Sequence, residues 1–489
     1  MRMVRDMDSV DAIVVGSGPN GMAAAVTLAR AGLAVRVYER NATIGGGARS
    51  GELTLPGFLH DVCSAVHPLA LSSGFFRRFE LAKRVDMIVP ELSYAQPLDD
   101  GRAGLAWRDL DRTADSLGSD GPAWERLFSP LVRRADEVAR FAGSPMVRSP
   151  RHPLAVALLG LRILEQGSAA WDLRFGGDVA PALLTGALAH SNRPLPSLGA
   201  AAAGLVLATT AHARGWPIPV GGSQAIIAAM ADDLLRHGGE IVTGTEVTDL
   251  NELPRAAAVL LDVSPKALSR IAGDRLPAGY RHAMERYRYG NAVAKVDFAL
   301  SGPVPWTNSE VARAGTVHVG GTRAQMVAAE ADVAAGRHPS DPYVLVSQPT
   351  AFDQSRAPAA RHVLWAYTHV PRGSTEDRTE AITARIERYA PGFRDTILAS
   401  SAMTATELEG YNPNYVGGDI AGGDVDLGQL IARPVLAPVP WRTPAEGLYL
   451  CSASTAPGPG IHGLAGFYAA RAALRAEFGI TATPHLGRD

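Results

Sequence analysis

The sequence predicts an α/β protein in which a parallel-sheet domain, assembled from separated segments, carries a second domain of mixed α+β structure. Three observations lead to this prediction. An apolar, β-branched segment at 10–15 runs directly into a glycine-rich turn and a helix. A second strand–loop–helix unit closes the chain at 447–478. Between them the hydrophobic pattern changes from helical spacing to strand alternation at about residue 291.

Length and composition limit the function classes. The chain has 489 residues, of which 46% are apolar and 20% charged, as expected for a folded globular protein of two or three domain-sized units. A formal charge of −2 gives no strong attraction to nucleic acid or anionic lipid. Cys63 and Cys451 lie far apart and outside any C-x-x-C motif, which excludes a disulfide framework, a C-x-x-C dithiol and a thiolate zinc site. We therefore expect no metal site, no nucleic-acid partner and a reducing, cytoplasmic location.

The glycine-rich turn has the G-x-G-x-x-G spacing of a dinucleotide site. Gly16 allows a tight turn after the strand, Gly18 lets the backbone approach a pyrophosphate, and Gly21 lets the following helix, 22–30, pack close to the strand. The helix N-terminus favours anions through its free N–H groups and its dipole. The residues expected to hold the phosphates are Gly16, Ser17, Gly18, Pro19, Asn20 and Gly21.

An acid and an arginine loop follow the second strand, 34–38. Glu39 lies 23 residues after Gly16, where an acid binds ribose hydroxyls, and Arg40 comes next. The segment Gly45-Gly46-Gly47-Ala48-Arg49 then fits a G-G-x-x-R pattern. Adjacent glycines let the backbone pass close to a cofactor, and Arg49 can supply donors to a phosphate or to the loop. Because NAD-only dehydrogenases generally lack this extension, the predicted cofactor is FAD.

The C-terminal unit is expected to return a second loop to the same site. A strand at 447–451 leads into a loop rich in glycine and proline, and a helix follows at 464–478. Such a loop delivers backbone N–H groups and a helix N-terminus to one place. The loop residues expected at the cofactor are Ser452, Ala453, Ser454, Ile461, His462 and Gly463.

These segments resemble the FAD-dependent phytoene desaturase-like proteins, a group related to the retinol saturases and, more remotely, to the monoamine and polyamine oxidases. The resemblance rests on VVGSGPNG, the acid at Glu39, IGGGARS and LYLCSASTAPGPGIHG, and it extends over most of the chain. The nearest likeness is to uncharacterised bacterial members. In this family a strand around Val247 passes the adenine, although here the hairpin that usually follows that strand is shortened or missing.

The resemblance implies how the chain divides into domains. A Rossmann-like FAD-binding domain would comprise 1–75, 216–268 and 440–489. The substrate domain would then comprise 76–215 and 269–439, with a helical cap and an antiparallel sheet. The pattern supports helices at 124–141, 153–165, 180–189 and 198–211, and strands at 291–300, 344–348 and 362–369.

Four residues are candidates for catalysis or substrate contact. Lys295, one of three lysines, precedes Trp306 as does the lysine that faces flavin N5 through water in the amine oxidases; the alternative is an outward-facing lysine on an edge strand. His462 would serve as an acid or base or would hydrogen-bond near the flavin. Tyr411 and Tyr415, in the turn YNPNY, are expected to line the substrate cavity.

The function implied is FAD-dependent dehydrogenation or desaturation of a largely apolar small molecule by hydride transfer to flavin N5. Oxygen, a quinone or another acceptor would reoxidise the flavin, and some peripheral contact with a membrane accompanies this type of cap. Three alternatives stay open: a saturase, a redox-neutral flavin isomerase of an isoprenoid-like substrate, and a flavin-binding interaction protein without turnover.

Overall fold

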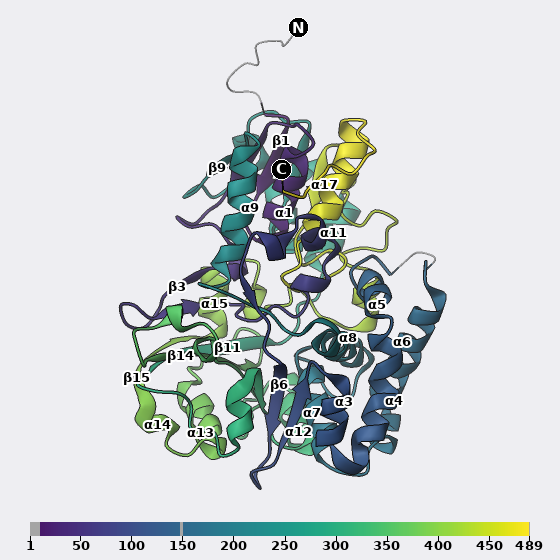
Figure 1. Ribbon diagram of the computed structural model, residues 1–489. Helices are drawn as coiled ribbons and strands as arrows, with labels where there is room; N and C mark the ends of the chain where they lie inside the picture. Colours follow the sequence, from purple (N-terminus) through teal and green to yellow (C-terminus); the bar gives the residue numbers. More distant parts are fainter. Residues whose placement is uncertain (1–9, 147–149, 489) are drawn as a thin grey trace.

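The computed structural model describes residues 10–146 and 150–488 and shows two domains. A domain built on a parallel sheet lies at the top of Figure 1, and a domain built on a larger mixed sheet lies below it. The chain crosses between the two domains several times, so both domains contain segments that are distant in the sequence. The predicted fold class is confirmed.

The parallel sheet has five strands in the order β16-β10-β1-β2-β9. Its strands come from the beginning, the middle and the end of the chain, and β1 lies at its centre, paired in parallel with β2 and β10. The side chains of β1 are buried on both faces, which explains its uninterrupted apolar sequence. The strand bounds are β1 Ala12–Val15, β2 Val35–Tyr38, β9 Glu240–Val242, β10 Ala258–Leu261 and β16 Leu448–Leu450.

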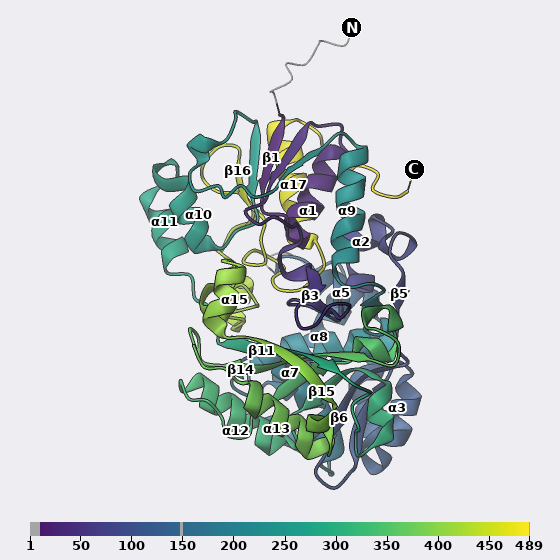
Figure 2. The same cartoon turned by 90° about the vertical axis from the view of Figure 1, so that its left-hand side faces the viewer.

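Helices cover both faces of the parallel sheet. Ala12 and Val14 of β1 pack in one cluster with α1 (Pro19–Ala29), α9 (Gln224–Arg236) and α17 (Leu464–Glu477). Ile13 and Val15 pack in another cluster with α10 (Pro265–Ala272) and α11 (Ala278–Glu285). Figure 2 shows α10 and α11 on the opposite side of the sheet from α9. The first and last helices of the described chain, α1 and α17, therefore share one core.

The mixed sheet has seven strands in the order β15-β11-β14-β13-β12-β6-β7. The predicted strands around 291–300, 344–348 and 362–369 are β11, β13 and β14, and β14 pairs antiparallel with both of the others. Among the described strands of this sheet, β12 and β6 are the one pair that runs parallel. The bounds are β6 Leu92–Pro97, β7 Ala103–Trp107, β11 Ala292–Leu300, β12 Ala314–Val319, β13 Val344–Ser347, β14 His362–Val370 and β15 Ile397–Met403.

The register of the mixed sheet places one row of residues on one face. Lys295 lies opposite Tyr367, Tyr367 opposite Leu345, and Leu345 opposite His318. Directly paired residues project from the same face of a sheet. This row therefore lies on a single face, and Leu345 and Tyr367 from it line the large cavity described below.

Helices form the cap predicted next to this sheet. The expected helix at 124–141 is two helices, because the chain leaves helical geometry at Arg134. Helix α8 runs through the middle of the cap and packs against α4, α5, α6 and α7. The bounds are α3 Leu110–Ser116, α4 Gly121–Val132, α5 Ala135–Ala142, α6 Pro153–Gln166, α7 Val179–Ala189 and α8 Leu198–Arg214; α12 Arg323–Ala334 and α13 Thr379–Tyr389 lie elsewhere on the mixed sheet.

Two details differ from the sequence prediction. The domain boundaries expected after residues 75 and 268 cut through α2 (Gly74–Arg78) and α10. Leu268, Ile271 and Met284 pack on the parallel sheet, so that domain extends through α11. Val247 lies on a loop between β9 and β10 and not on a strand, because the shortened connection leaves no partner strand for it.

Within the described ranges, no helix combines the length and the apolar character needed to cross a bilayer. The same ranges contain no group of three His, Cys, Asp or Glu side chains arranged to hold a metal ion. Cys63 and Cys451 are both free thiols.

The contact between α1 and α17 generates a stability prediction. A Cβ atom on Gly466 would stand 1.7 Å from the backbone oxygen of Asn20, so Gly466→Ala must push the helices apart. We expect a loss of about 1–3 kcal/mol in the free energy of unfolding, measured by urea denaturation. Gly160→Ala is the matched control, because nothing lies within 4 Å of that position in α6. It should gain about 0.5–1 kcal/mol. Equal effects at the two positions would contradict the packing argument.

Candidate functional site

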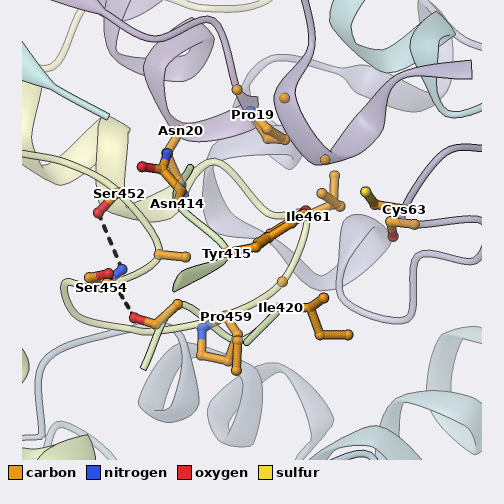
Figure 3. Close-up of a pocket in the computed structure, with 18 of the residues that line it drawn as sticks. Pro19, Asn20, Cys63, Asn414, Tyr415, Ile420, Ser452, Ser454, Pro459 and Ile461 are labelled. Carbon is orange, nitrogen blue, oxygen red and sulfur yellow. Dashed lines mark hydrogen bonds between the residues drawn. The ribbon is translucent and has the colours of Figure 1, made fainter. Parts of the chain in front are cut away.

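A cavity of about 530 Å³ lies between the two domains. We divide it into two parts. The nucleotide limb is bordered by 16–20, 39–41, Arg49, 245–247, Asp262, Arg270 and the start of the C-terminal loop. The chamber is bordered by the cap helices and the mixed sheet, through Phe141, Leu159, Ile163, His190, Val206, Leu207, Trp216, Thr316, Leu345, Trp365 and Tyr367. Segments from across the chain converge where the limb and the chamber meet, as Figure 3 shows for Pro19, Cys63, Tyr415 and Ile461.

The glycine-rich turn is shaped by close backbone contacts. Gly16 has φ of +99°, which favours glycine, and a Cβ on Gly21 would stand 2.0 Å from the Gly16 carbonyl oxygen. The turn therefore places the N-terminus of α1 beside the cavity without a side chain in between. Gly46 of the second glycine motif lies against this turn, with its Cβ position 3.0 Å from the Gly18 Cα. The two motifs form one cradle of backbone.

Glu39 ties this cradle together. One carboxylate oxygen accepts hydrogen bonds from the Ser17 N–H at 3.1 Å and from the Ser17 hydroxyl at 2.5 Å. The other accepts from the backbone and side-chain N–H groups of Asn41, both at 2.9 Å, and from Arg49 Nη2 at 3.2 Å. Ser17 Oγ in turn accepts from the Gly45 N–H. Glu39 thus fixes the first turn, the second strand and the arginine loop in one arrangement.

Arg49 borders the nucleotide limb and is held on two sides. It pairs with Glu39, and its guanidinium lies 5.1 Å from the ring centre of Tyr411. Its Nε is buried and has no hydrogen-bond partner among the described residues, and neither has the nearby Asn20 Oδ1. A donor and an acceptor without partners at the edge of this limb fit a polar ligand such as a dinucleotide.

The C-terminal loop closes the other side of the limb. Ser454 donates its hydroxyl to the Gly422 carbonyl at 2.7 Å (Figure 3). Arg433, almost fully buried, donates to the carbonyls of Ala453 and Ala421 at 3.0 and 2.7 Å. Asp419 accepts the backbone N–H groups of Ala421 and Gly423 and also that of Gly290, so it shapes the glycine-rich segment 417–428 and ties it to the residues that precede β11. That segment serves as a loop that supports the C-terminal loop.

The predicted site residues divide into two groups. Those that border the cavity are Gly16, Ser17, Gly18, Pro19, Asn20, Glu39, Arg40, Gly46, Gly47, Arg49, Val247, Ser452, Ala453, Ser454, Ile461 and Tyr415. Those that lie behind its wall are Gly21, Gly45, Ala48, Gly463, His462, Lys295 and Tyr411. Gly21 and Gly45 still act on the site because they set the backbone of the cradle.

His462 does not reach the cavity. Its Nδ1 accepts the Leu464 N–H at 3.0 Å, which leaves Nε2 to donate to the Gly458 carbonyl at 3.1 Å. Burial lowers the pKa of His462 to about 4, so the ring is neutral near pH 7. Both nitrogens hold the C-terminal loop and the start of α17, and the geometry gives no support to the expected acid–base role.

Lys295 also lies beneath the cavity wall. It lies on β11 and forms a buried ion pair with Asp297. Asp297 is two residues further along the strand, so its side chain projects from the same face. Its Nζ also lies 3.5 Å from the Asp61 carbonyl oxygen. Asp297 was not considered in the sequence prediction, and it accounts for this position of the ammonium. The alternative of an outward-facing lysine is therefore wrong, because the side chain is 2% exposed, whereas the position of Lys295 relative to flavin N5 stays a prediction.

The two tyrosines of the YNPNY turn have different positions. Tyr415 borders the cavity, and its hydroxyl would stand 2.0 Å from a Cβ on Gly47. Gly47 is therefore needed to make room for it. Tyr411 lies behind the wall against Arg49, where it supports the arginine and not the substrate.

The sequence analysis did not identify two buried ionisable residues near the site. Asp262 ends β10 beside the glycine turn and accepts the Gly21 N–H at 2.9 Å; burial raises its pKa to about 7. Its position directly after an apolar strand was a usable signal, because ligands bind at the carboxyl ends of parallel strands. Arg356, fully buried, pairs with Asp61 at 2.8 Å and with Asp353 at 2.8 Å. The local sequence shows only the pairing of Arg356 with Asp353, because its other partner, Asp61, is 295 residues away.

The Lys295–Asp297 pair predicts a pH-dependent loss of stability. Burial raises the pKa of Asp297 to about 6 even beside Lys295, and Lys295→Met should raise it further. The folded variant then holds a proton that the unfolded chain has released, so its stability falls as the pH rises. We expect a loss of about 3–5 kcal/mol at about pH 8 and a smaller loss at about pH 5, measured by urea denaturation.

The matched control for that experiment is Lys295→Met combined with Asp297→Asn, which removes both charges. Its stability should depend on pH as that of the wild-type protein does, apart from the contribution of Asp297. A loss in Lys295→Met that is the same at both pH values would contradict the buried-pair explanation.

Comparisons with known proteins agree with this geometry. Residues 14–79 match the family model described as an NAD(P)-binding Rossmann-like domain. A rat pyridine nucleotide-disulfide oxidoreductase domain-containing protein is 25% identical, with 95% of this chain and 93% of the relative covered. An uncharacterized Mycobacterium tuberculosis protein is 27% identical, covering 95% and 97%. Phytoene dehydrogenase of Streptomyces griseus is 28% identical, covering 79% and 77%.

Solved structures show the same fold. A putrescine oxidase variant superposes with a TM-score of 0.62 at 20% identity, covering 96% of this chain and 98% of the other. Cyclohexylamine oxidase from Brevibacterium oxydans gives a TM-score of 0.55 at 16% identity, with 96% and 98% covered. The resemblance stated from the sequence is therefore confirmed: the chain is similar over most of its length to phytoene dehydrogenase, and it shares its fold with the amine oxidases.

Proposed function

We propose that the protein is an FAD-dependent oxidoreductase that dehydrogenates an uncharged, largely apolar small molecule. The observation that carries this proposal is the single cavity in which a dinucleotide cradle opens into an apolar chamber. The backbone of 16–21 and 45–47, with Glu39 and Arg49, fits the adenine nucleotide half of FAD. The loop 452–461 and Tyr415 border the junction with the chamber, where the isoalloxazine would be held. When bound, FAD supplies a hydride acceptor at N5.

The charge distribution along the cavity supports an uncharged substrate. Its bordering carboxylates, Glu39, Glu246 and Asp262, all belong to the nucleotide limb, as do Arg40, Arg49 and Arg270. Among the described residues, no charged side chain borders the chamber. An ammonium or carboxylate ion moved into such surroundings loses its hydration without gaining a partner. The chamber thus differs from what a charged substrate requires, although two of the fold neighbours are named for amines.

The chain's own residues contribute positioning and the exclusion of water. Trp365 and Tyr367 lie side by side on β14, with ring planes at 85°, and form part of the chamber floor. Val206 and Leu207 of α8 border it from the cap. Apolar walls of this kind hold an apolar skeleton near the junction and keep solvent away during hydride transfer.

Cofactor content provides the first test. The purified protein should show visible flavin absorbance and release FAD on denaturation. Glu39→Ala removes the hydrogen bonds that hold the cradle, and we expect the ratio of flavin to protein to fall about tenfold or more. Glu240→Ala, which removes an exposed acid paired with Arg36 on the neighbouring strand, should keep its flavin. A colourless wild-type protein that cannot be reconstituted with FAD would favour a role in interaction over turnover.

Substrate class is tested by anaerobic bleaching of the bound flavin. Uncharged apolar compounds should bleach it, whereas alkylamines that are protonated at the working pH should not. Ala203→Phe, which places a ring in the chamber from α8, should slow bleaching by about 100-fold and leave the flavin content unchanged. Bleaching by amines alone would contradict the proposal, and net isomerisation with reduced flavin would point to the isomerase alternative.

A further inference from the structure

A histidine pair lies in the chamber wall, apart from the nucleotide limb. His190 follows the last residue of α7, and His318 lies on β12; their Nε2 atoms are 2.8 Å apart. Because neutral imidazole carries one N–H, one ring donates this hydrogen bond and the other accepts it. The ring planes meet at 80°, and Trp216 packs against His190 with ring centres 5.6 Å apart. The pair is therefore held in one orientation.

The two rings have different surroundings. His318 is fully buried behind the wall, between Tyr94 and Tyr343, with ring centres at 5.1 and 6.0 Å. His190 borders the cavity, and its Nδ1 makes no hydrogen bond within the described part of the chain. Burial lowers the pKa of His190 to about 3 and that of His318 well below its usual value, so both rings are neutral at physiological pH. His318 thus serves as a fixed support, and His190 offers a free nitrogen.

A second unpartnered polar group lies at the same end of the chamber. Ser191 borders the cavity next to His190, is 6% exposed, and its buried hydroxyl has no partner among the described residues. Buried polar groups without partners are rare and costly in folded proteins. The buried hydroxyl of Ser191 and the unpaired Nδ1 of the half-buried His190 are adjacent in an otherwise apolar chamber wall. Together they indicate a ligand that brings its own hydrogen-bonding group to this point.

The chemistry of a neutral imidazole identifies that group. A hydroxyl both donates and accepts, so it pairs with Nδ1 in either tautomer of His190 and can reach Ser191 as well. A carboxylate finds no cation here, and an ammonium finds no anion, because charged side chains border only the nucleotide limb. A pure hydrocarbon leaves both polar atoms unpaired, and a site built to hydrogen-bond a hydroxyl discriminates against ligands that lack it.

We propose that His190, supported by His318, binds a hydroxyl group of the substrate, which is therefore a neutral alcohol on an apolar skeleton. This inference rests on the proposed oxidoreductase function and narrows its substrate class. It assigns His190 as the residue that determines which end of the substrate enters this part of the chamber.

The test compares three ligands of one skeleton: cyclododecanol, cyclododecanone and cyclododecane. Their binding to the purified holoprotein is followed by tryptophan fluorescence, to which Trp216 and Trp365 in the chamber wall respond. The wild-type protein should bind the alcohol about tenfold more tightly than the hydrocarbon. His190→Phe, which keeps a ring and removes both nitrogens, should abolish this preference while the affinity for the hydrocarbon is unchanged. His190→Asn should restore part of it.

The matched control is Tyr343→Phe. It removes one buried hydroxyl, bonded to the Gly186 carbonyl at 3.0 Å, next to the pair but outside the cavity wall. It should keep the wild-type preference. A wild-type protein without preference for the alcohol, including one that binds none of the three ligands, overturns the proposal, and so does a preference that persists in both His190 variants. Stronger binding of the ketone than of the alcohol also overturns it.

Flavin content measured on the same samples separates this inference from the proposed function. A protein that contains FAD and bleaches with apolar compounds but shows no alcohol preference overturns the role of His190 alone. A protein without FAD that still prefers the alcohol, and loses this preference in His190→Phe, overturns the oxidoreductase proposal and leaves His190 as a ligand-binding residue.

Discussion

The approach of α17 to α1 is the constraint on which the site depends. A Cβ on Gly466 would stand 1.7 Å from the Asn20 oxygen, and a Cβ on Gly21 would stand 2.0 Å from the Gly16 oxygen. Backbone therefore contacts backbone at two places. The start of α1 packs against the turn that follows β1, and α17 packs against α1. The loops at 16–21 and 452–463 are attached to these helices, so both take their positions at the cavity from a contact between segments more than 400 residues apart. The nucleotide limb exists only when the two ends of the chain have packed together.

Charge is distributed so that the chamber stays neutral. Arg356 is buried but satisfied by Asp61 and Asp353, and Lys295 is buried but paired with Asp297. None of the residues in these three ion pairs borders the cavity. A buried charge without a partner would be costly, and one open to the chamber would polarise or trap a substrate. The strong charges are thus paired with one another outside the cavity wall, which leaves recognition of the proposed substrate to shape and to neutral hydrogen bonds.

The sequence predicted the parts of the site that local motifs determine. The glycine turn, Glu39 and Arg49 each have a role set by the residues within a few positions, and the structure places them around one cavity edge. Prediction was weaker where a role depends on register. Lys295 was compared with a catalytic lysine because its strand looked similar. Its actual partner, Asp297, was visible in the sequence, but only the structure shows that the two side chains form a buried ion pair. His462 was placed in the correct loop, but its direction depends on the Gly458 carbonyl.

The chamber could not be predicted because its polar end has no local signature. His190 and His318 are 128 residues apart in the sequence. They come into contact because α7 ends next to the face of β12 that carries His318. Neither residue belongs to a sequence motif, and either one alone is indistinguishable in the sequence from an ordinary buried histidine. Motifs for a dinucleotide constrain the backbone, which must approach the cofactor in one way, and so they persist across relatives with different substrates. The substrate space has no such requirement. Its chemistry is set by which side chains the sheet register and helix packing bring to one wall, and for this chain they bring uncharged nitrogen and oxygen atoms to an apolar chamber.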